Sequence, residues 1–156
     1  MTGCESIYQP CLDAAFRYLS YRPRSELEIK MRLRKRGFDD FSIESTLLRL
    51  KEQGLVDDFA FAQFWKESRE SFSPRGRVML NRELRQKGVD SHIIAEAIRD
   101  LDEEAGAYRA AQKKAEKLSL SDRESFYRKL GSFLRRRGFN YEITQYTVKQ
   151  LWLERI

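Results

Sequence analysis

The sequence predicts an all-α protein of three tandem three-helix, helix-turn-helix-like repeats that form a short curved array. Strand-favouring residues are scarce, because Val, Ile and Thr together number 16 among 156 residues. Three glycines, Gly37, Gly88 and Gly138, recur at intervals of 51 and 50 residues. Apolar residues recur in the same positions around each glycine, as expected for a repeat protein. The predicted repeats span residues 11–55, 56–102 and 103–156, after a flexible N-terminus over residues 1–10.

Columns of apolar residues accompany the three glycines. They lie eight and four residues before each glycine, one residue after it, and ten and thirteen residues after it. In column order they are Ile29, Leu80 and Leu130; Leu33, Leu84 and Leu134; Phe38, Val89 and Phe139; Leu47, Ile98 and Val148; Leu50, Leu101 and Leu151. The first two columns share one helix face and the last two share another, so each glycine is predicted to separate two amphipathic helices.

The glycine and the two residues after it predict a tight turn between these helices. Glycine just beyond a helix end adopts the left-handed conformation that closes the helix, and the next apolar residue contacts the last turn. We therefore expect Phe38 to pack on Leu33, with the same contact in the other repeats. The following Asp39, Asp90 or Asn140 is expected to cap the next helix.

In the first repeat, a helix that includes residues 14–19 precedes the glycine-separated pair. The second helix is predicted to begin at the capping box Ser25-x-x-Glu28, with Pro23 suited to its first turn. Residues 1–10 lack both the basic and the apolar region of a secretory signal, so we expect no such signal there.

The second repeat is predicted to begin with a helix whose N-cap is the Asp57-Asp58 pair. Its middle helix is expected to follow Ser73 as cap and Pro74 in the first turn. The third repeat starts from Glu103 with a helix that packs through alanines, and Ser121-x-x-Glu124 resembles a second capping box.

Charge is distributed unevenly along the chain. The formal net charge of +6 divides into +2, −1 and +5 over the three successive segments 1–55, 56–102 and 103–156. Such a basic end favours a polyanion or an acidic protein surface as partner, although it also serves solubility. The longest apolar run is the four residues Phe59–Ala62, which is too short to cross a membrane. Cys4 and Cys11 are expected to be reduced cytoplasmic thiols.

The sequence offers no catalytic constellation. It has a single histidine, His92, which is expected to be exposed, and it lacks a glycine-rich phosphate loop. A zinc site would need four ligands, and the Asp57-Asp58 pair is better explained as a helix cap than as a metal site. The sequence therefore predicts a binding protein without metal or cofactor, and no enzyme.

Three segments resemble the signature of the RecX family. They are Arg22–Ile29 followed by Leu33–Gly37; Gly54–Ala62 followed by Trp65 and Arg69; and Gly76, Leu80, Glu83-Leu84 and Lys87–Val89. The resemblance covers nearly the whole chain from about residue 11 and is looser in the third repeat. It implies a monomeric cytoplasmic regulator that binds the RecA–DNA filament and suppresses RecA ATPase and strand exchange in DNA repair, recombination and the SOS response.

The same resemblance implies tandem three-helix repeats, no cofactor, and weak, non-specific affinity for single- and double-stranded DNA. An alternative from the basic helix–turn–helix pattern is a protein that acts on DNA directly, either without sequence preference or as a transcription regulator. The helix after each glycine is poor in base-reading side chains, which favours contacts to phosphates over contacts to bases.

The candidate binding residues lie in the last helical turn before each glycine. Eight of these nine positions are basic: Arg34, Lys35, Arg36, Arg85, Lys87, Arg135, Arg136 and Arg137. Cations there complement the negative end of the helix dipole, which is the structural interpretation. A triple arginine exceeds what the dipole requires. We therefore hypothesise that these eight residues, the basic stripe, contact RecA or DNA.

The aromatic cluster of Phe59, Phe61, Phe64 and Trp65 is expected to pack between helices, with stacking on bases as the alternative. Arg22 and Arg69 occupy matching positions, and both are expected to form salt bridges with Glu28 or Asp57.

Overall fold

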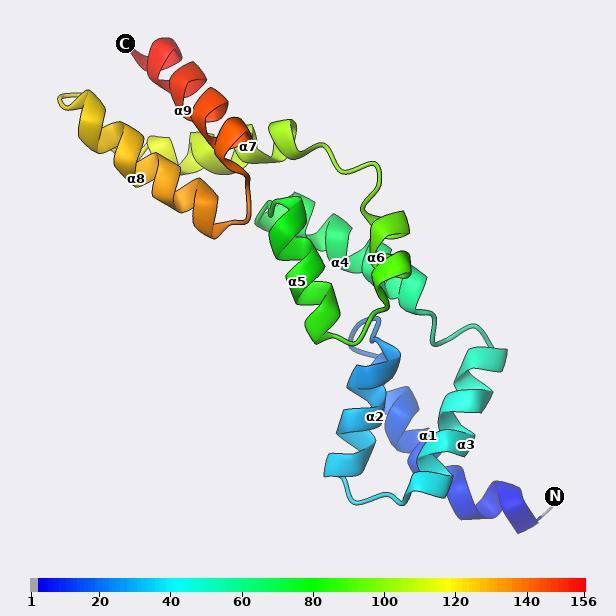
Figure 1. Cartoon of the computed structure of the whole chain (residues 1–156). Helices are drawn as coiled ribbons and strands as arrows, with labels where there is room; N and C mark the ends of the chain where they lie inside the picture. The colour runs from blue at the N-terminus through cyan, green and yellow to red at the C-terminus, as the bar shows by residue number, and fades with distance from the viewer. Residues whose placement is uncertain (1–2) are drawn as a thin grey trace. The chain divides into compact units, whose positions relative to one another are not determined.

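The computed structural model describes the backbone of residues 3–156 and the side chains from residue 8 onward. Over this range it contains nine α-helices and no strand (Figure 1). They are α1 (Gly3–Leu19), α2 (Glu26–Lys35), α3 (Asp40–Glu52), α4 (Asp58–Phe72), α5 (Arg77–Gln86), α6 (Ser91–Ala97), α7 (Glu103–Ala115), α8 (Arg123–Arg136) and α9 (Tyr141–Arg155). The predicted all-α class with three helices per repeat is confirmed. None of these helices is both long enough and apolar enough to cross a membrane.

The chain forms two compact units that divide the middle repeat between them. Unit 1 contains the chain up to Phe64 together with Leu84–Ile94, and unit 2 contains Trp65–Glu83 together with Ala95–Ile156. The end of α5 therefore belongs with the first repeat, and the start of α5 belongs with the third.

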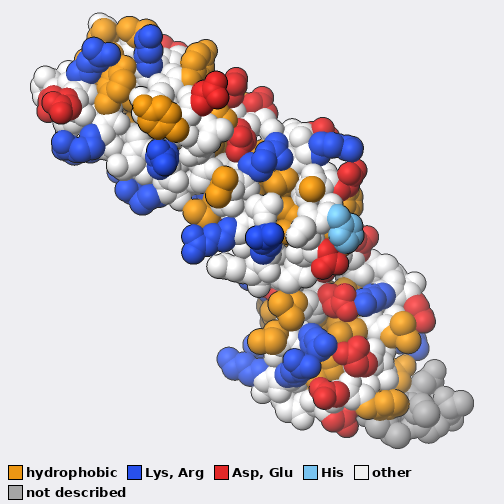
Figure 2. Space-filling view, viewed as in Figure 1, with side chains coloured by type: hydrophobic (Ala, Val, Ile, Leu, Met, Phe, Trp, Pro, Cys, Tyr) orange, Lys and Arg blue, Asp and Glu red, His pale blue; other side chains and the backbone are white. Residues whose placement is uncertain are grey.

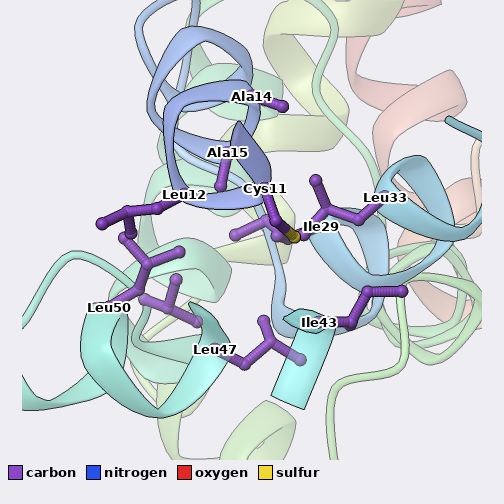
Figure 3. Packing of buried hydrophobic residues seen from close by; sticks show 10 residues of the cluster. Cys11, Leu12, Ala14, Ala15, Ile29, Leu33, Ile43, Leu47 and Leu50 are labelled. Carbon is purple, nitrogen blue, oxygen red and sulfur yellow. The ribbon is translucent and has the colours of Figure 1, made fainter. Parts of the chain in front are cut away.

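In unit 1, helices α1, α2 and α3 pack on one another around a buried apolar cluster (Figure 3). Figure 3 shows side chains of α1, such as Cys11, lying toward Ile29 of α2 and Leu47 of α3. Tyr8 also packs against this cluster, and α1 begins at Gly3. Residues 3–10 therefore form the first turns of α1, and the flexibility expected of the N-terminus stays a prediction.

Cys11 is a free, buried thiol at the centre of this cluster. Burial raises its pKa, and the nearby Thr46 side chain only partly opposes that effect. A thiol held neutral in this way is a poor nucleophile and acts as a small apolar residue. The side chain of Cys4 lies outside the residues described.

In unit 2, helices α7, α8 and α9 pack on one another through small residues on α7. Ala107, Ala111 and Ala115 are almost fully buried, as predicted for this helix. Aromatic side chains fill the space on the other two helices, with the Phe126 and Trp152 ring centroids 5.2 Å apart. The alanines turn one face of α7 inward and leave its opposite, charged face to solvent.

The apolar columns of the middle repeat are buried, but its last helix is shorter than predicted. Leu80, Leu84 and Ile98 are each at most 1% exposed. Helix α6 ends at Ala97, so Ile98 and Leu101 lie beyond it and do not share a helix face. Long cations take the carbonyl oxygens that another turn would use: Lys66 donates to Ala97 at 3.4 Å and Arg77 to Ile98 at 3.0 Å.

The predicted helix caps are confirmed in part. Ser25 and Glu28 form a reciprocal capping box, and Asp39 and Asn140 accept hydrogen bonds from the backbone three residues ahead. The expected cap at Ser121 is wrong, since the N-cap of α8 is Asp122. The Ser121 hydroxyl is instead paired with that of Ser119 at 2.7 Å.

The expected cap at Ser73 is also wrong. Helix α5 begins at Arg77, so Ser73 and Pro74 precede it, as Pro23 precedes α2. Remote groups satisfy the first donors of α5: the Arg77 N–H donates to Glu103 Oε1 at 2.5 Å. Tertiary contacts thus replace the local cap that the sequence predicts.

Candidate protein and nucleic-acid interface

The same turn places the basic stripe at the surface in each repeat. Gly37, Gly88 and Gly138 have φ angles of 90°, 80° and 89°, the left-handed region that favours glycine. The N–H of the next residue donates to the carbonyl five residues earlier in all three turns, at 3.1–3.2 Å. This is the hydrogen bond of a Schellman motif, which confirms the predicted turn. Gly54, with φ of 70°, closes α3 in the same way and has no counterpart in the other repeats.

Six members of the basic stripe are exposed, and Figure 2 shows Lys and Arg side chains over one face of the protein. They are Arg34, Lys35, Arg36, Arg85, Arg135 and Arg136. Arg34 makes only a long contact of 3.8 Å with Asp40, and both side chains are largely solvated. Such a pair contributes little to stability, so these cations are available to a partner.

Lys87 occupies the last stripe position of the middle repeat and contacts Ser25 and Glu28 of the first repeat. We call this set of contacts the unit 1 joint. The Lys87 carbonyl oxygen accepts a hydrogen bond from Ser25 Oγ at 2.7 Å, and its ammonium lies 3.4 Å from Glu28. Glu28 also pairs with Arg22 at 2.5 Å, which confirms the salt bridge expected for Arg22. Burial raises the pKa of Glu28, but hydrogen bonds from Arg22 and Ser25 and the nearby cations outweigh it and lower the pKa overall.

Arg137 occupies the matching position of the third repeat and contacts Ser73 and Gly76 of the middle repeat. We call this set of contacts the unit 2 joint. The Arg137 carbonyl oxygen accepts from the Gly76 N–H at 2.8 Å, and its guanidinium donates to Ser73 Oγ. The guanidinium also lies 4.8 Å from the centre of the Phe133 ring. Arg137 is therefore half-buried and structural as well as charged.

Glycine is required at both joints by close packing as well as by its φ angle. A Cβ atom on Gly88 would lie 2.6 Å from Leu27 Cβ, and one on Gly138 would lie 2.7 Å from the Met79 backbone nitrogen. A Cβ on Gly37 would meet nothing within 4 Å. The two joints thus bring neighbouring repeats together where a helix end passes over the start of another helix.

A shallow groove of about 860 Å³ lies beside the joint in unit 1. Its lining residues are Tyr18, Leu27, Glu28, Met31, Arg32, Arg34, Lys35, Gln86 and Lys87. Leu27 and Met31 are 38% and 56% exposed, so the groove has an apolar floor open to solvent. Three residues of the basic stripe, Arg34, Lys35 and Lys87, lie along it. The fold therefore combines stripe cations with apolar surface, which sequence spacing alone did not indicate.

A cleft of about 470 Å³ lies in unit 2 and has a different lining. Its residues are Glu70, Ser71, Phe72, Ser73, Pro74, Arg109, Ala110, Lys113, Lys114, Lys117, Phe133 and Arg137. Arg137 is the one member of the basic stripe in this set. The three cations on α7 and Lys117 just beyond it were not among the predicted site residues. Arg109 and Lys113 lie opposite the buried alanines of α7, and this spacing is the signal that marks them as exposed.

The other candidate residues have structural roles. Asp57 accepts hydrogen bonds from the Phe59 and Ala60 N–H groups, which confirms it as an N-cap. Asp58 instead accepts from the Glu26 N–H at 2.9 Å, and burial raises its pKa. Within the described residues no group of three or more His, Cys, Asp or Glu side chains could hold a metal ion.

The aromatic cluster and Arg69 are also largely accounted for by packing. Phe61 is 1% exposed, and Trp65 Nε1 donates to Glu83 at 3.0 Å. Arg69 pairs with the same Glu83 at 2.8 Å, so its expected partners were wrong. The partner differs because Glu83 lies on the next helix of unit 2, within reach of both side chains. His92 is exposed, as predicted, and is the pale-blue side chain at the surface in Figure 2.

Comparison with known proteins gives a consistent result across the chain. Three family models, described as the first, second and third three-helix domains of RecX, match residues 11–50, 57–98 and 102–148. The regulatory protein RecX of Chlorobaculum tepidum is 40% identical over 138 residues, which cover 88% of this chain and 86% of that protein. That of Prosthecochloris aestuarii is 38% identical over 147 residues, covering 94% of this chain and 97% of that protein.

Solved structures of other proteins have a similar fold. The crystal structure of RecX from Lactobacillus salivarius aligns with a TM-score of 0.79 at 23% identity, covering 94% of this chain and 97% of that chain. A second structure, of a regulatory protein RecX, aligns with a TM-score of 0.77 at 22% identity, covering 90% of this chain and 70% of that chain. The three-helix arrangement described above is therefore shared with these proteins.

Proposed function

This chain belongs to the RecX family of regulatory proteins, and from that premise we propose that it binds the RecA–DNA filament. Binding there inhibits the RecA ATPase, strand exchange and recombination during DNA repair and the SOS response. The protein acts in the cytoplasm as a monomer and by binding alone, without catalysis or a cofactor. Its role as a regulator of RecA follows from the family, and the surfaces described above supply the contacts.

The groove in unit 1 is the observation that best supports contact with a protein. Exposed Leu27 and Met31 form an apolar floor, and Arg34 and Lys35 provide charge beside it. Apolar surface surrounded by cations complements a protein surface that carries apolar and acidic side chains. Duplex DNA would leave that floor uncovered, because its bases are stacked on one another and its phosphates face outward. Leu27 and Met31 are aliphatic and offer an unpaired base no ring to stack on. We therefore assign this groove to RecA.

The exposed stripe cations support contact with polyanions more generally. Arg36, Arg85 and the Arg135-Arg136 pair are exposed at helix ends, where they can position phosphates without reading bases. This favours the alternative in which the protein binds DNA directly and without sequence preference. The short α6, of seven residues, argues against a transcription regulator that reads a duplex with this helix.

The rate of ATP hydrolysis by RecA on single-stranded DNA distinguishes binding to the RecA–DNA filament from direct binding to DNA. We expect the rate to fall when this protein is far too scarce to coat the DNA, because each bound molecule acts on a filament. Inhibition that requires enough protein to cover the DNA would instead support direct DNA binding.

Substitution of two exposed apolar residues of unit 1, Met31 and Leu48, tests the assignment of the groove to RecA. Met31→Asp should weaken the inhibition, since it places a carboxylate on the apolar floor. Leu48→Asp is the matched control, because Leu48 is 60% exposed and lies outside the groove. Equal inhibition by the two variants would contradict the assignment of the groove to RecA.

A further inference from the structure

The cleft in unit 2 concentrates positive charge on residues that come from three separate segments. The end of α4 with the loop after it contributes residues 70–74, α7 contributes Arg109, Lys113 and Lys114 with Lys117 after it, and α8 contributes Phe133 with Arg137 after it. Five cations and a single carboxylate, that of Glu70, therefore line one cleft. A cleft with one predominant sign of charge concentrates the field that attracts an oppositely charged ligand.

The cations of the cleft are not used by the fold as ion pairs. Among the described side chains, none of these five forms a salt bridge with a carboxylate. Arg109 reaches the Glu70 carbonyl oxygen at 3.5 Å, and Lys114 lies 5.8 Å from the centre of the Phe133 ring. Lys113 and Lys117 are exposed. Like charges held together without carboxylate partners repel one another, and a bound anion would relieve that repulsion.

The spacing of the cations on α7 fits a chain of phosphates. Arg109, Lys113 and Lys117 follow one another at intervals of four residues. Arg109 and Lys113 lie on one face of α7, and Lys117 follows two residues after the helix ends. The interval from Arg109 to Lys113 advances about 6 Å along the helix axis. Evenly spaced cations of this kind suit a ligand with repeated anionic groups.

An exposed aromatic side chain lies in the same cleft. Phe72 ends α4 and is 86% exposed, the largest exposed fraction among the apolar side chains described. Phe133, by contrast, already has Lys114 and Arg137 near its ring. A free aromatic face beside a row of cations is the combination by which proteins hold single strands, with phosphates on the cations and a base on the ring.

We propose that this cleft is a binding site for single-stranded nucleic acid. Arg109 and Lys113 of α7, and Lys117 just beyond it, contact consecutive phosphates, and Phe72 stacks on an unpaired base. A duplex presents the phosphates but keeps its bases stacked, so it uses only part of the site. The inference rests on the proposed function in taking nucleic acid as a partner, but it assigns the strand to unit 2 and leaves the groove of unit 1 to protein.

Binding of the full chain to a labelled oligothymidylate of about 12 nucleotides tests the proposal, with a duplex of equal length and inorganic polyphosphate as further probes. Phe72→Ala should weaken oligothymidylate binding by at least about fivefold and leave polyphosphate binding unchanged. Lys113→Gln with Lys117→Gln should weaken binding of all three probes. It should also reduce the salt slope for the single strand by about 1.4, because two phosphate contacts are lost.

Matched controls separate this site from general surface charge and apolarity. Phe41→Ala removes an aromatic side chain that is 61% exposed on α3, and Arg128→Gln with Lys129→Gln removes two exposed cations of α8 outside the cleft. Cleft and control variants that bind oligothymidylate equally would overturn the proposal. So would a Phe72→Ala variant that loses polyphosphate binding to the same extent.

The RecA ATPase assay is run on the same variants and distinguishes this proposal from the proposed function. If the unaltered protein inhibits RecA while the cleft variants bind oligothymidylate normally, the cleft assignment fails and the proposed function stands. If the cleft variants lose oligothymidylate binding but the unaltered protein does not inhibit RecA, the proposed function fails and the cleft assignment stands.

Discussion

The groove of unit 1 and the cleft of unit 2 lie beside equivalent joints and have different linings. Lys87 lines the groove and Arg137 the cleft, and both residues stand immediately before a turn glycine. Around Lys87 the fold places exposed Leu27 and Met31, whereas around Arg137 it places the cations of α7. A repeated backbone contact can thus carry two different surfaces. The side chains that face each joint decide which kind of partner it fits.

The joints themselves differ in how their charged groups are held. In unit 1 a carboxylate, Glu28, receives both Arg22 and Lys87. In unit 2 a hydroxyl, Ser73, receives both Arg75 and Arg137. Burial and the neighbouring Arg69 lower the pKa of both of these arginines. Glu28 therefore offsets one of the two cations in the unit 1 joint. In the unit 2 joint Arg75 also reaches Glu83 at 3.6 Å, whereas Arg137 is held by a neutral hydroxyl, so its positive charge remains beside the cleft.

The largest expected effect is a loss of stability when the core of the middle repeat is disrupted. Both joints contain residues of that repeat. Leu84→Ala should lower the free energy of unfolding by about 2–5 kcal/mol, because Leu84 is fully buried and its removal leaves a cavity. Chemical denaturation measures this cost. A loss below about 0.5 kcal/mol, the range of surface substitutions, would contradict the repeat register.

A pair of glycine substitutions compares a turn inside a joint with a turn outside one. Gly37→Ala should cost about 1–2 kcal/mol, which is the cost of a left-handed conformation for alanine. Gly138→Ala adds a clash with the Met79 backbone and should cost a further ~1–3 kcal/mol. Equal unfolding free energies for the two variants would mean that the joint accommodates a Cβ atom.

The triple arginine separates structural from exposed stripe residues. Arg137→Ala removes the hydrogen bond to Ser73 and the contact with Phe133, and should cost about 1–3 kcal/mol of stability. Arg135→Ala with Arg136→Ala removes two dipole complements, for which solvent screening keeps the cost near the lower end of about 0.3–1 kcal/mol each. We expect this double variant to melt almost normally and yet to bind DNA more weakly. Thermal melting beside DNA binding makes the comparison.

The smallest expected effect is a difference in acid sensitivity between the joints. The pKa of Glu28 is lower in the folded protein than its ordinary value near 4.5. Its stabilising contribution is therefore complete above that ordinary value and is lost as the pH falls through the folded pKa. Glu28→Gln should flatten this part of the stability profile. Ser73→Ala, in the other joint, should lower stability by a similar amount at every pH, because a hydroxyl does not titrate there.

Much of the local structure was determined by the sequence itself. The spacing of Gly37, Gly88 and Gly138, with leucines four residues earlier, correctly predicted helix ends with left-handed glycines. Asp39 and Asn140 were correctly identified as caps. These features depend on hydrogen bonds and contacts within about five residues along the chain, so their residue types and spacing carry the information.

Tertiary structure alone decided which caps and helix ends differ from those that the local sequence predicts. Asp122 caps α8 in place of Ser121, α6 stops at Ala97 where Lys66 and Arg77 take the next carbonyl oxygens, and Ser73 binds Arg137 instead of capping α5. The stripe likewise divides into exposed cations and the two residues held in joints. Ser73 and Arg137 are 64 residues apart in sequence. Their contact, and the cleft around it, arise only when packing brings distant segments together, because the strength of such a contact depends on position in space and not on spacing along the chain.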